Sequence, residues 1–389
     1  MAFSLRTAVA SLSPLLDRIG ADFSVPAAVV GLIGSAPPVC FAIFGILTPL
    51  LTAKIGLERI TVLALVLITA GLFARGFAPN ALWLLALTCV IFAGVAIGNV
   101  VLPPLVKKYF PDRLSAMMTL YTTMIAFSTF VPPLLTVPLA DLTHWRTSLG
   151  FWAVFALAGL VPWVMLILRD RMPQAAAPVV PAAPSAQLFR RMWTLRLPWA
   201  LAVVFSLSSV MAYVGFAWLP TIYMDVAGVD AATAGALLSL YAAVGLPASL
   251  LVPVLVVRFG ATRPLFFVSI SATAAGLLGL ILAPAAALPL WTILWGLFGI
   301  LFPLSLVLIS IRARTHESAV ALSGFAQSIG YAMAALFPLL TGVLHDTTGG
   351  WQVPLLVLAA LTVISVPFGI IAGRRTTVEE EWERRHGAW

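Results

Sequence analysis

The sequence predicts an all-α membrane protein with twelve transmembrane helices in two pseudo-symmetric six-helix bundles. Of its 389 residues, 61% are hydrophobic and 9% are charged, and a soluble domain of this length cannot bury so much apolar surface. Apolar runs of about 20 residues, the length that crosses ~30 Å of hydrocarbon, recur along the chain. In addition, one short peptide occurs once in each half of the chain.

The repeated peptide indicates that the chain is an internal duplication. Its copies at residues 133–141 and 338–346 both begin with Pro-Leu-Leu-Thr and both end in Asp. A second pair, residues 49–59 and 253–263, keeps Pro, Gly and Arg in register. Parallel repeats in a hydrophobic chain are typical of transporters whose substrate site lies between the two halves.

The predicted helices follow the apolar runs in order. Every span must satisfy its own backbone hydrogen bonds, so the runs form helices and not open strands. The six spans of the first half cover residues 2–17, 26–52, 60–77, 82–106, 115–140 and 147–168. The six spans of the second half cover residues 197–223, 231–257, 264–282, 288–311, 318–342 and 351–372. The first span is short, and only the apolar stretch 283–287 separates the ninth from the tenth.

The distribution of charge predicts the orientation in the membrane. The formal net charge of +8 would by itself suggest a nucleic-acid partner. However, numbering the loops from an inside N-terminus places eighteen basic residues inside and only Arg18, Arg75 and Arg146 outside. The positive-inside rule then predicts that both termini are cytoplasmic. No basic patch is interleaved with aromatic residues, so we expect no nucleic-acid partner.

These spans divide the chain into four parts. They are an N-terminal bundle, a cytoplasmic Pro/Ala-rich linker, a C-terminal bundle and a cytoplasmic tail, at residues 1–168, 169–196, 197–372 and 373–389. We interpret the linker as an extended tether, with a short interfacial helix carrying Arg190, Arg191 and Arg196 as the alternative. For the tail, a short surface helix and a disordered segment are both compatible with the sequence.

Several function classes find no support in the sequence. No acidic residue lies in the middle of a predicted span, so no intramembrane proton relay can be named. Metal-ligand spacing, a nucleotide-binding loop and a nucleophile constellation are absent, so we predict neither an enzyme nor a cofactor or metal. Cys40 and Cys89 fall inside predicted helices and are expected to be free thiols. The N-terminus lacks the pattern of a removable signal peptide.

Arg6 is the one charge predicted to lie deep within a span. The first span leaves the membrane at Asp17. At the helical rise of about 1.5 Å per residue, Arg6 lies about 16 Å below that point, near the middle of the membrane. An arginine at that depth needs an aqueous cavity and a negative partner, and an anionic substrate is the natural one. Its planar guanidinium suits a small planar or carboxylate-like anion. In the alternative interpretation, the helix starts at Met1 and Arg6 flanks its inner end. Few residues precede Arg6, so either the natural start lies upstream or the first helix is short.

Polar residues within other spans are the next candidates for substrate binding. They are Asn99, Tyr121, Tyr213, Gln327 and Tyr331. Gln327 and Tyr331 are one helical turn apart and share a face. For any of them, a hydrogen bond between helices is as reasonable as substrate contact. Glycines and prolines are also dense in the spans, among them Gly94, Gly98, Gly296 and Gly299, where both gating and close packing are reasonable.

Several segments together resemble the cyanate/2-nitroimidazole transporter group of the major facilitator superfamily. They are residues 5–7, 98–107, 110–113, 120–123, 218–220, 322–331, 345–346 and 350–351. The resemblance implies a twelve-helix carrier of the bacterial inner membrane that works by alternating access on small anions or small nitro-heterocycles. It marks Arg6, Asn99, Tyr121, Tyr213 and Gln327 as positions that match the pattern.

Two inside loops resemble the loop motif of the superfamily in a degenerate form. Ala53 and Val257 stand where that motif has Asp, so its charge-pair latch is in doubt. Candidate substitute partners are Glu58, Asp112 and Glu317. The predicted inside-gate residues are Lys54, Arg59, Arg113, Arg258, Arg263 and Arg312. The predicted outside-gate residues are Asp141 and Asp346, which end the two copies of the repeated peptide.

Together these observations predict a secondary active or facilitative transporter that moves a small anion. Uniport fits the missing acidic relay, and proton symport is open if the proton travels on the substrate. The alternative function is efflux of neutral nitro-heterocycles or other small drugs, in which Arg6 would be dispensable. A non-transporting membrane receptor is a third possibility, but the chain has no sizeable soluble domain. A monomer is expected, since both halves of the pathway lie on one chain.

Overall fold

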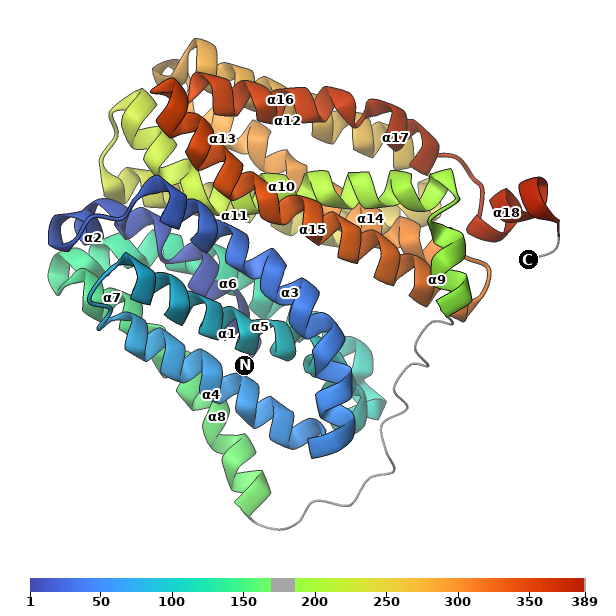
Figure 1. The fold of residues 1–389 in the computed structure, drawn as a ribbon, viewed down its shortest axis with the longest axis horizontal. Coiled ribbons are helices and arrows are strands. Elements are labelled where there is room, and N and C mark those ends of the chain that lie inside the picture. The colour runs from blue at the N-terminus through green and yellow to red at the C-terminus, as the bar shows by residue number, and fades with distance from the viewer. Residues whose placement is uncertain (169–185, 388–389) are drawn as a thin grey trace. The chain divides into compact units, whose positions relative to one another are not determined.

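The computed structural model describes residues 1–168 and 186–387, and every element in these two ranges is a helix (Figure 1). The helices of the first range are α1 Ser4–Ala10, η1 Ser13–Leu15, α2 Leu16–Asp22, α3 Ala27–Ile55, α4 Leu57–Arg75, α5 Ala81–Tyr109, η2 Pro111–Arg113, α6 Leu114–Leu142, α7 Trp145–Phe151 and α8 Ala153–Leu168. Those of the second range are α9 Ala186–Met192, α10 Arg196–Ala227, α11 Ala231–Phe259, α12 Thr262–Leu282, η3 Pro284–Ala286, α13 Leu288–Gly296, η4 Leu297–Ile300, α14 Leu301–Ile311, α15 His316–Thr348, α16 Gln352–Ile364, α17 Val366–Ala372 and α18 Val378–His386.

Eleven helical segments of the described chain are long and apolar enough to cross a membrane. Each overlaps one of the predicted spans from the second to the twelfth. In three of these spans the α-helix is interrupted, at Trp152, at the 3-10 helix η4 and at Ser365. The predicted fold class, an all-α membrane protein, is therefore confirmed.

The first predicted span, residues 2–17, is wrong as a continuous helix. It is divided into α1, η1 and the start of α2. Pro14 has no N–H to donate and its ring obstructs the preceding turn, so the chain leaves the helix at Ser11 and resumes in η1. None of these pieces is long enough to count as a span alone.

The helices gather into two compact units. Unit 1 comprises Met1–Val180, Phe216–Ser239 and Pro338–Val343, and unit 2 comprises Pro181–Gly215, Leu240–Phe337 and Leu344–Trp389. Three helices, α10, α11 and α15, therefore contribute residues to both units. The domain boundaries given above stay a prediction, and most of the predicted linker lies outside the described residues.

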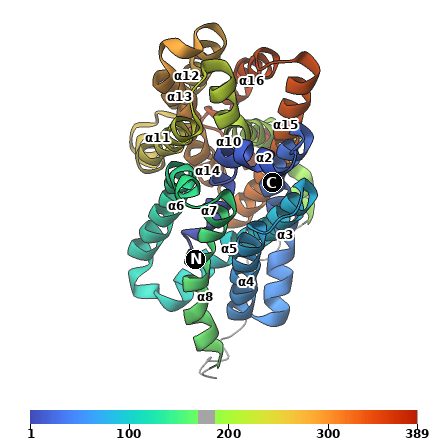
Figure 2. The ribbon, with the colours of Figure 1, turned by 90° about the vertical axis from the view of Figure 1, so that its left-hand side faces the viewer.

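Within each unit, glycines permit close helix packing. In unit 1, α4 runs beside α5 and α8 (Figure 2). A Cβ at Gly94 would lie 2.6 Å from the carbonyl oxygen of Ala64. In unit 2, a Cβ at Gly299 would lie 2.9 Å from the Cα of Gly245, and one at Gly296 would lie 3.0 Å from the carbonyl oxygen of Tyr241. The packing interpretation of these glycines is thus supported by direct contacts.

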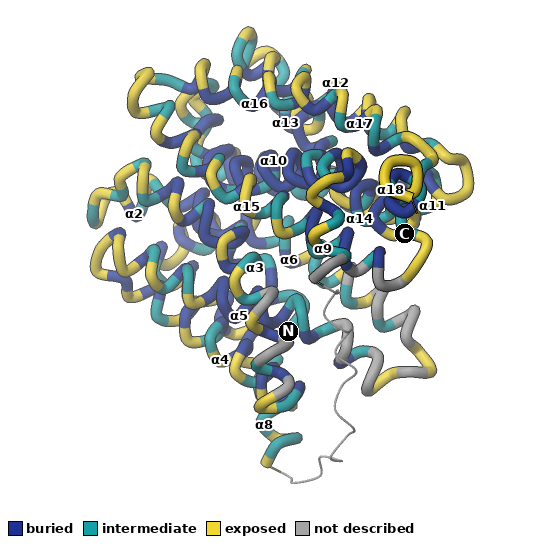
Figure 3. The backbone as a smooth tube through the Cα atoms, turned by 45° about the vertical axis from the view of Figure 1, so that its right-hand side comes forward, coloured by how far each residue is buried: buried dark blue, intermediate teal, exposed yellow. Residues whose placement is uncertain are grey.

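The tail forms the helix α18, which is anchored to other parts of unit 2. Thr377 and Glu380 form a capping box at its start. The carboxylate of Glu381 accepts hydrogen bonds from the backbone N–H groups of Arg196 and Leu197, both at 2.9 Å, at the start of α10. The carboxylate of Glu379 accepts one at 2.9 Å from the N–H of Arg314, just before α15. Figure 3 shows that the second half of α18 is exposed.

Candidate functional site

Arg6 lies on α1, which packs against α5 and α6 in unit 1. Its side chain is half-buried. The guanidinium carbon is 5.7 Å from the centre of the Phe41 ring on α3. Tyr121 of α6 packs, like Phe41, against the hydrophobic cluster that includes Leu5 and Ala8 of α1. The structure thus brings two predicted residues, Arg6 and Tyr121, together with an aromatic ring that the sequence did not single out.

Asn99 lies on α5, next to a residue that contacts α1. A Cβ on the preceding residue, Gly98, would lie only 2.7 Å from Cδ2 of Leu5, the neighbour of Arg6. Asn99 itself is half-buried. Its side-chain amide makes no hydrogen bond to any other residue in the described ranges.

The other three predicted binding residues lie in unit 2. The side-chain amide of Gln327 donates to Oγ of Ser323 at 2.6 Å, one turn earlier on α15. The Tyr331 ring packs edge-on against Phe205 of α10, with centroids 4.9 Å apart. Tyr213 is buried within α10. Arg6, Asn99 and Tyr121 thus lie in unit 1, and Tyr213, Gln327 and Tyr331 lie in unit 2.

Arg75 is a residue whose importance the sequence reasoning missed. It was counted among the outside loop charges, but it ends α4 and is fully buried. Its guanidinium donates to the carbonyl oxygen of Ala8 at 3.2 Å and to Oγ of Ser11 at 3.1 Å. The Ala8 carbonyl is one of the backbone groups that the break after α1 leaves without a helical partner. Arg75 therefore holds the end of the short helix that carries Arg6.

The predicted inside-gate residues have different surroundings. Lys54, Arg59, Arg113, Arg258 and Arg263 are exposed. Arg312 is buried instead, and its carbonyl oxygen accepts a hydrogen bond from the N–H of Val378 in α18 at 2.9 Å. Burial lowers the pKa of the Arg312 guanidinium, and the neighbouring positive charge of Arg375 lowers this pKa further.

Of the candidate partners for these residues, Glu58 is the best defined. It is buried at the start of α4 and accepts a hydrogen bond from the Tyr109 hydroxyl at 3.0 Å. Burial and this hydrogen bond raise the pKa of Tyr109 to about 12. Asp112 is exposed. The side chain of Glu317 lies outside the described part of the chain.

The two predicted outside-gate residues belong to different units. Asp141, in unit 1, forms an ion pair with Arg18, which ties the end of α6 to α2. A second ion pair, between Arg146 and Asp22 at 3.2 Å, joins α7 to the end of α2. Asp346, in unit 2, lies 3.4 Å from Nδ1 of its neighbour His345 and is otherwise exposed.

Both copies of the repeated peptide make close contacts through their first proline, and both contacts lie in unit 1. A Cβ at Gly31 of α3 would lie 2.6 Å from Cα of Leu339 and 2.9 Å from the carbonyl oxygen of Pro338. A Cβ at Gly235 of α11 would lie 2.6 Å from the carbonyl oxygen of Pro133. We call these the paired Pro–Gly contacts, because each joins a copy of the repeat to a glycine.

Comparison with known proteins shows extensive similarity. The sequence pattern of the Major Facilitator Superfamily matches residues 1–337. The chain is 32% identical over 393 residues to the uncharacterized transporter YycB of Bacillus subtilis, covering 100% of this chain and 95% of that protein. It is 33% identical over 376 residues to the 2-nitroimidazole transporter of Escherichia coli, covering 96% and 93%. It is 26% identical over 383 residues to the cyanate transport protein CynX of Escherichia coli, covering 97% of each.

Among solved structures, the fold is similar to that of a bacterial homologue of the human lysosomal transporter Spinster. The TM-score is 0.73 at 17% sequence identity, and the match covers 98% of this chain and 96% of the other. At this identity, the similarity concerns the fold alone.

Proposed function

Because the chain belongs to the major facilitator superfamily, we propose that it moves a small anion, cyanate-like or organic, across the bacterial inner membrane by alternating access. It is a membrane transporter of a small molecule, and the predicted resemblance to the cyanate and 2-nitroimidazole transporters is confirmed. The anionic substrate, the inner membrane, the cytoplasmic termini and the monomeric state belong to the proposal.

The observation that carries the proposal is the position of Arg6 over the ring of Phe41, on a helix that packs against α6, the helix of Tyr121. A charged side chain within a membrane-spanning bundle is costly, and such residues usually mark substrate or ion pathways. A guanidinium offers several N–H donors in one plane, which suits a small planar anion. The aromatic rings of Phe41 on α3 and Tyr121 on α6 can contact the faces of such a planar substrate.

We assign the supporting roles to amide and hydroxyl groups. The unoccupied hydrogen-bonding capacity of Asn99 suits a second contact near α1. Tyr213, Gln327 and Tyr331 are proposed to contribute from unit 2 during part of the transport cycle. The predicted gate residues keep their assigned roles within this proposal. Arg312 differs from the others in being buried, and its backbone carbonyl accepts a hydrogen bond from α18.

A second candidate function is transport of neutral nitro-heterocycles. The similarity to the 2-nitroimidazole transporter of Escherichia coli favours it, since this relative is 33% identical over nearly the full length. The rings of Phe41 and Tyr121 would then stack on the substrate, and the charge of Arg6 would contribute little.

The test is uptake into proteoliposomes by wild type, Arg6→Gln and the control Arg190→Gln, which alters an exposed arginine on α9. Labelled cyanate and labelled 2-nitroimidazole are supplied separately, with unlabelled small anions as competitors. Charge-assisted hydrogen bonds contribute about 1.5–3 kcal/mol, so Arg6→Gln should weaken apparent anion affinity about 10- to 100-fold. Wild-type anion transport by Arg6→Gln would refute the proposal. Uptake of 2-nitroimidazole alone, equal in all three proteins, would establish the second candidate.

A further inference from the structure

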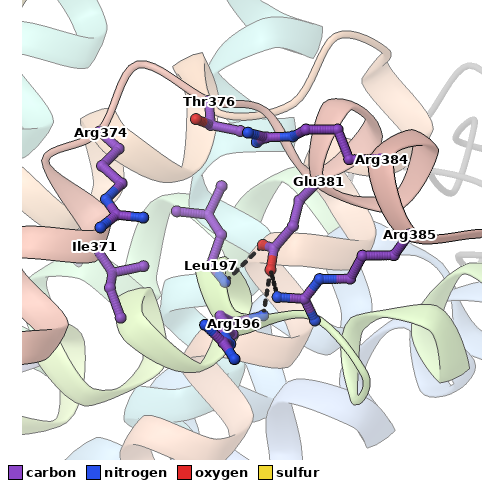
Figure 4. Close-up of a pocket in the computed structure, with 8 residues that line it drawn as sticks. All are labelled: Arg196, Leu197, Ile371, Arg374, Thr376, Glu381, Arg384 and Arg385. Carbon is purple, nitrogen blue, oxygen red and sulfur yellow. Dashed lines mark hydrogen bonds and ion pairs between the residues drawn. The ribbon is translucent and has the colours of Figure 1, made fainter.

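A pocket rich in arginine lies where three segments of unit 2 meet, away from the residues assigned to substrate binding. Its volume is about 310 Å³. The start of α10 contributes Arg196, the chain after α17 contributes Arg374 and Thr376, and α18 contributes Glu381, Arg384 and Arg385 (Figure 4). Four positive charges and one negative charge line it, which leaves a net charge of +3.

The single carboxylate in the pocket is already engaged. Glu381 accepts hydrogen bonds from the N–H groups of Arg196 and Leu197 and forms an ion pair with Arg385 at 2.9 Å. Its negative charge therefore interacts with the backbone N–H groups at the start of α10 and with the guanidinium of Arg385. Little of this charge remains to neutralise the other guanidinium groups of the pocket.

The other guanidinium groups lack anionic partners within hydrogen-bonding distance. Within residues 1–168 and 186–387, the side chains of Arg196 and Arg374 make no hydrogen bond or ion pair. Arg384 donates from Nε to the backbone carbonyl oxygen of Glu380 at 3.1 Å. Like charges that face one cavity repel one another, and an anion in the cavity would remove this repulsion.

The pocket adjoins the end of a membrane-spanning segment. Ile371, on the last turn of α17, is part of its lining, and the apolar segment Gln352–Ala372 ends beside it. A neighbouring pocket of about 440 Å³ shares Arg374 and adds Arg263 and Arg375. The basic surface thus continues along the end of unit 2, at the level where lipid headgroups meet the apolar part of a helix.

We infer that the pocket of Arg196, Arg374 and Arg384 binds a phosphate group, supplied by the headgroup of an anionic phospholipid. Guanidinium groups recognise phosphate oxygens through paired N–H donors, and the Thr376 hydroxyl adds a further donor. The position of Ile371 favours a lipid source, because the acyl chains can lie along α17 while the phosphate enters the pocket. Because α18 contributes Arg384, the docked tail is part of the site.

The test measures binding to the full-length protein, purified and delipidated in detergent. The probes are dioctanoyl phosphatidylglycerol, dioctanoyl phosphatidylcholine and inorganic phosphate. Ligands that bind only the folded state raise the midpoint of thermal unfolding with concentration. Phosphatidylglycerol should raise it, and the cationic choline group should prevent phosphatidylcholine from doing so. Native mass spectrometry counts the bound lipids independently.

Three variants, each of which removes one arginine charge, test whether the lipid binds in this pocket. Arg196→Gln and Arg374→Gln should each weaken the apparent affinity for phosphatidylglycerol about fivefold, the share of one basic residue near a lipid surface. Arg190→Gln, which removes an exposed arginine of unit 2 outside the pocket, should leave the affinity unchanged.

The outcomes separate the two sources of phosphate. Stabilisation by phosphatidylglycerol alone identifies a lipid headgroup, whereas equal stabilisation by inorganic phosphate, lost in the pocket variants, identifies a free phosphate site. Equal effects of the two lipids, or equal affinities in all three variants, would overturn the inference. Neither result depends on transport, so the proposed function is tested separately.

Discussion

Arg75 shows how much of the candidate site depends on a residue outside it. The guanidinium satisfies the carbonyl oxygen of Ala8 and the hydroxyl of Ser11, where α1 breaks off. Arg6 lies on the same short helix. The position of Arg6 therefore depends on a second arginine, at the end of α4, that does not take part in its contacts with Phe41 and Tyr121.

Substitution of Arg75 by alanine should destabilise the protein and also weaken substrate binding. The variant leaves a buried carbonyl oxygen without a donor, which costs about 1–3 kcal/mol, and it opens a cavity that adds to this loss. Thermal unfolding in detergent measures the stability, and ligand-induced stabilisation reports on the Arg6 site. Arg18→Ala is the control, because the exposed pair with Asp141 should contribute less than ~1 kcal/mol. Equal stability of the two variants would contradict the role of Arg75.

At the residue scale, the sequence shows which arginines lie in or near the apolar runs, but not which groups surround them in the structure. Arg6 could be selected because it is the one basic residue that falls within an apolar run away from the ends. Arg75 stands at the end of such a run, where a basic residue normally faces water. A usable signal was present in Ser11, Ser13 and Pro14, which predict a helix break whose carbonyl groups need a donor. The donor itself lies 64 residues further along the chain than Ser11, so only the tertiary structure reveals it.

At the scale of elements, α18 shows how a short polar helix can be fixed in place. Its first turn carries Glu379 and Glu381, and each carboxylate accepts backbone N–H groups at or just before the start of a membrane-spanning helix. Negative charge at a helix start also interacts favourably with the helix dipole. α18 therefore satisfies backbone groups that would otherwise require water.

Glu381→Ala should lower the free energy of unfolding by about 2 kcal/mol, since two N–H groups of α10 lose their acceptor. Hydrogen exchange of the amides of residues 196 and 197 should accelerate in the same variant. Glu383→Ala is a matched control on the same helix, because its pair with Arg314 is exposed and should contribute little. If exchange at these amides matched that of the control, the capping role of Glu381 would be wrong.

At this scale, local sequence patterns predict where helices lie along the chain, but not where a short helix docks. Eleven predicted spans overlap observed ones because length and apolar composition are sufficient to identify a helix that can cross a membrane. The spacing of Thr377 and Glu380 matches a capping box, a local signal that favours the helical alternative for the tail. The docking of α18 was not, because Glu381 contacts residues 184 and 185 positions away in the sequence.

At the scale of the whole molecule, the paired Pro–Gly contacts give the duplication a structural meaning. Pro338 lies against Gly31 of α3 and Pro133 against Gly235 of α11, so each copy of the repeat has an equivalent contact. The indole N–H of Trp218 adds a hydrogen bond to the carbonyl oxygen of Pro338 at 2.8 Å. The sequence revealed the repeat, but not that its prolines meet glycines.

Gly31→Ala and Gly235→Ala should both reduce the transport rate while ligand binding at Arg6 persists. Each new Cβ would lie 2.6 Å from backbone atoms, and such overpacking typically costs about 1–3 kcal/mol. In the proposed alternating-access cycle these contacts form and break. A substitution that disfavours the conformation with the contacts formed would therefore slow the cycle. Gly150→Ala is the matched control, since nothing lies within 4 Å of its Cβ position. Initial uptake rates that match the control would exclude this role.

Unit 1 is built from segments that are far apart in the sequence, and this has a consequence for biosynthesis. This unit includes residues 338–343, which are translated long after α3. Until they leave the ribosome and insert, Gly31 and Gly34 have no Pro338 to pack against, although α3 has long been in the membrane. Nascent chains therefore pass through a prolonged stage with incomplete helix contacts. A premature stop codon anywhere before residue 338 would leave even the N-terminal unit unfinished and exposed to membrane quality control.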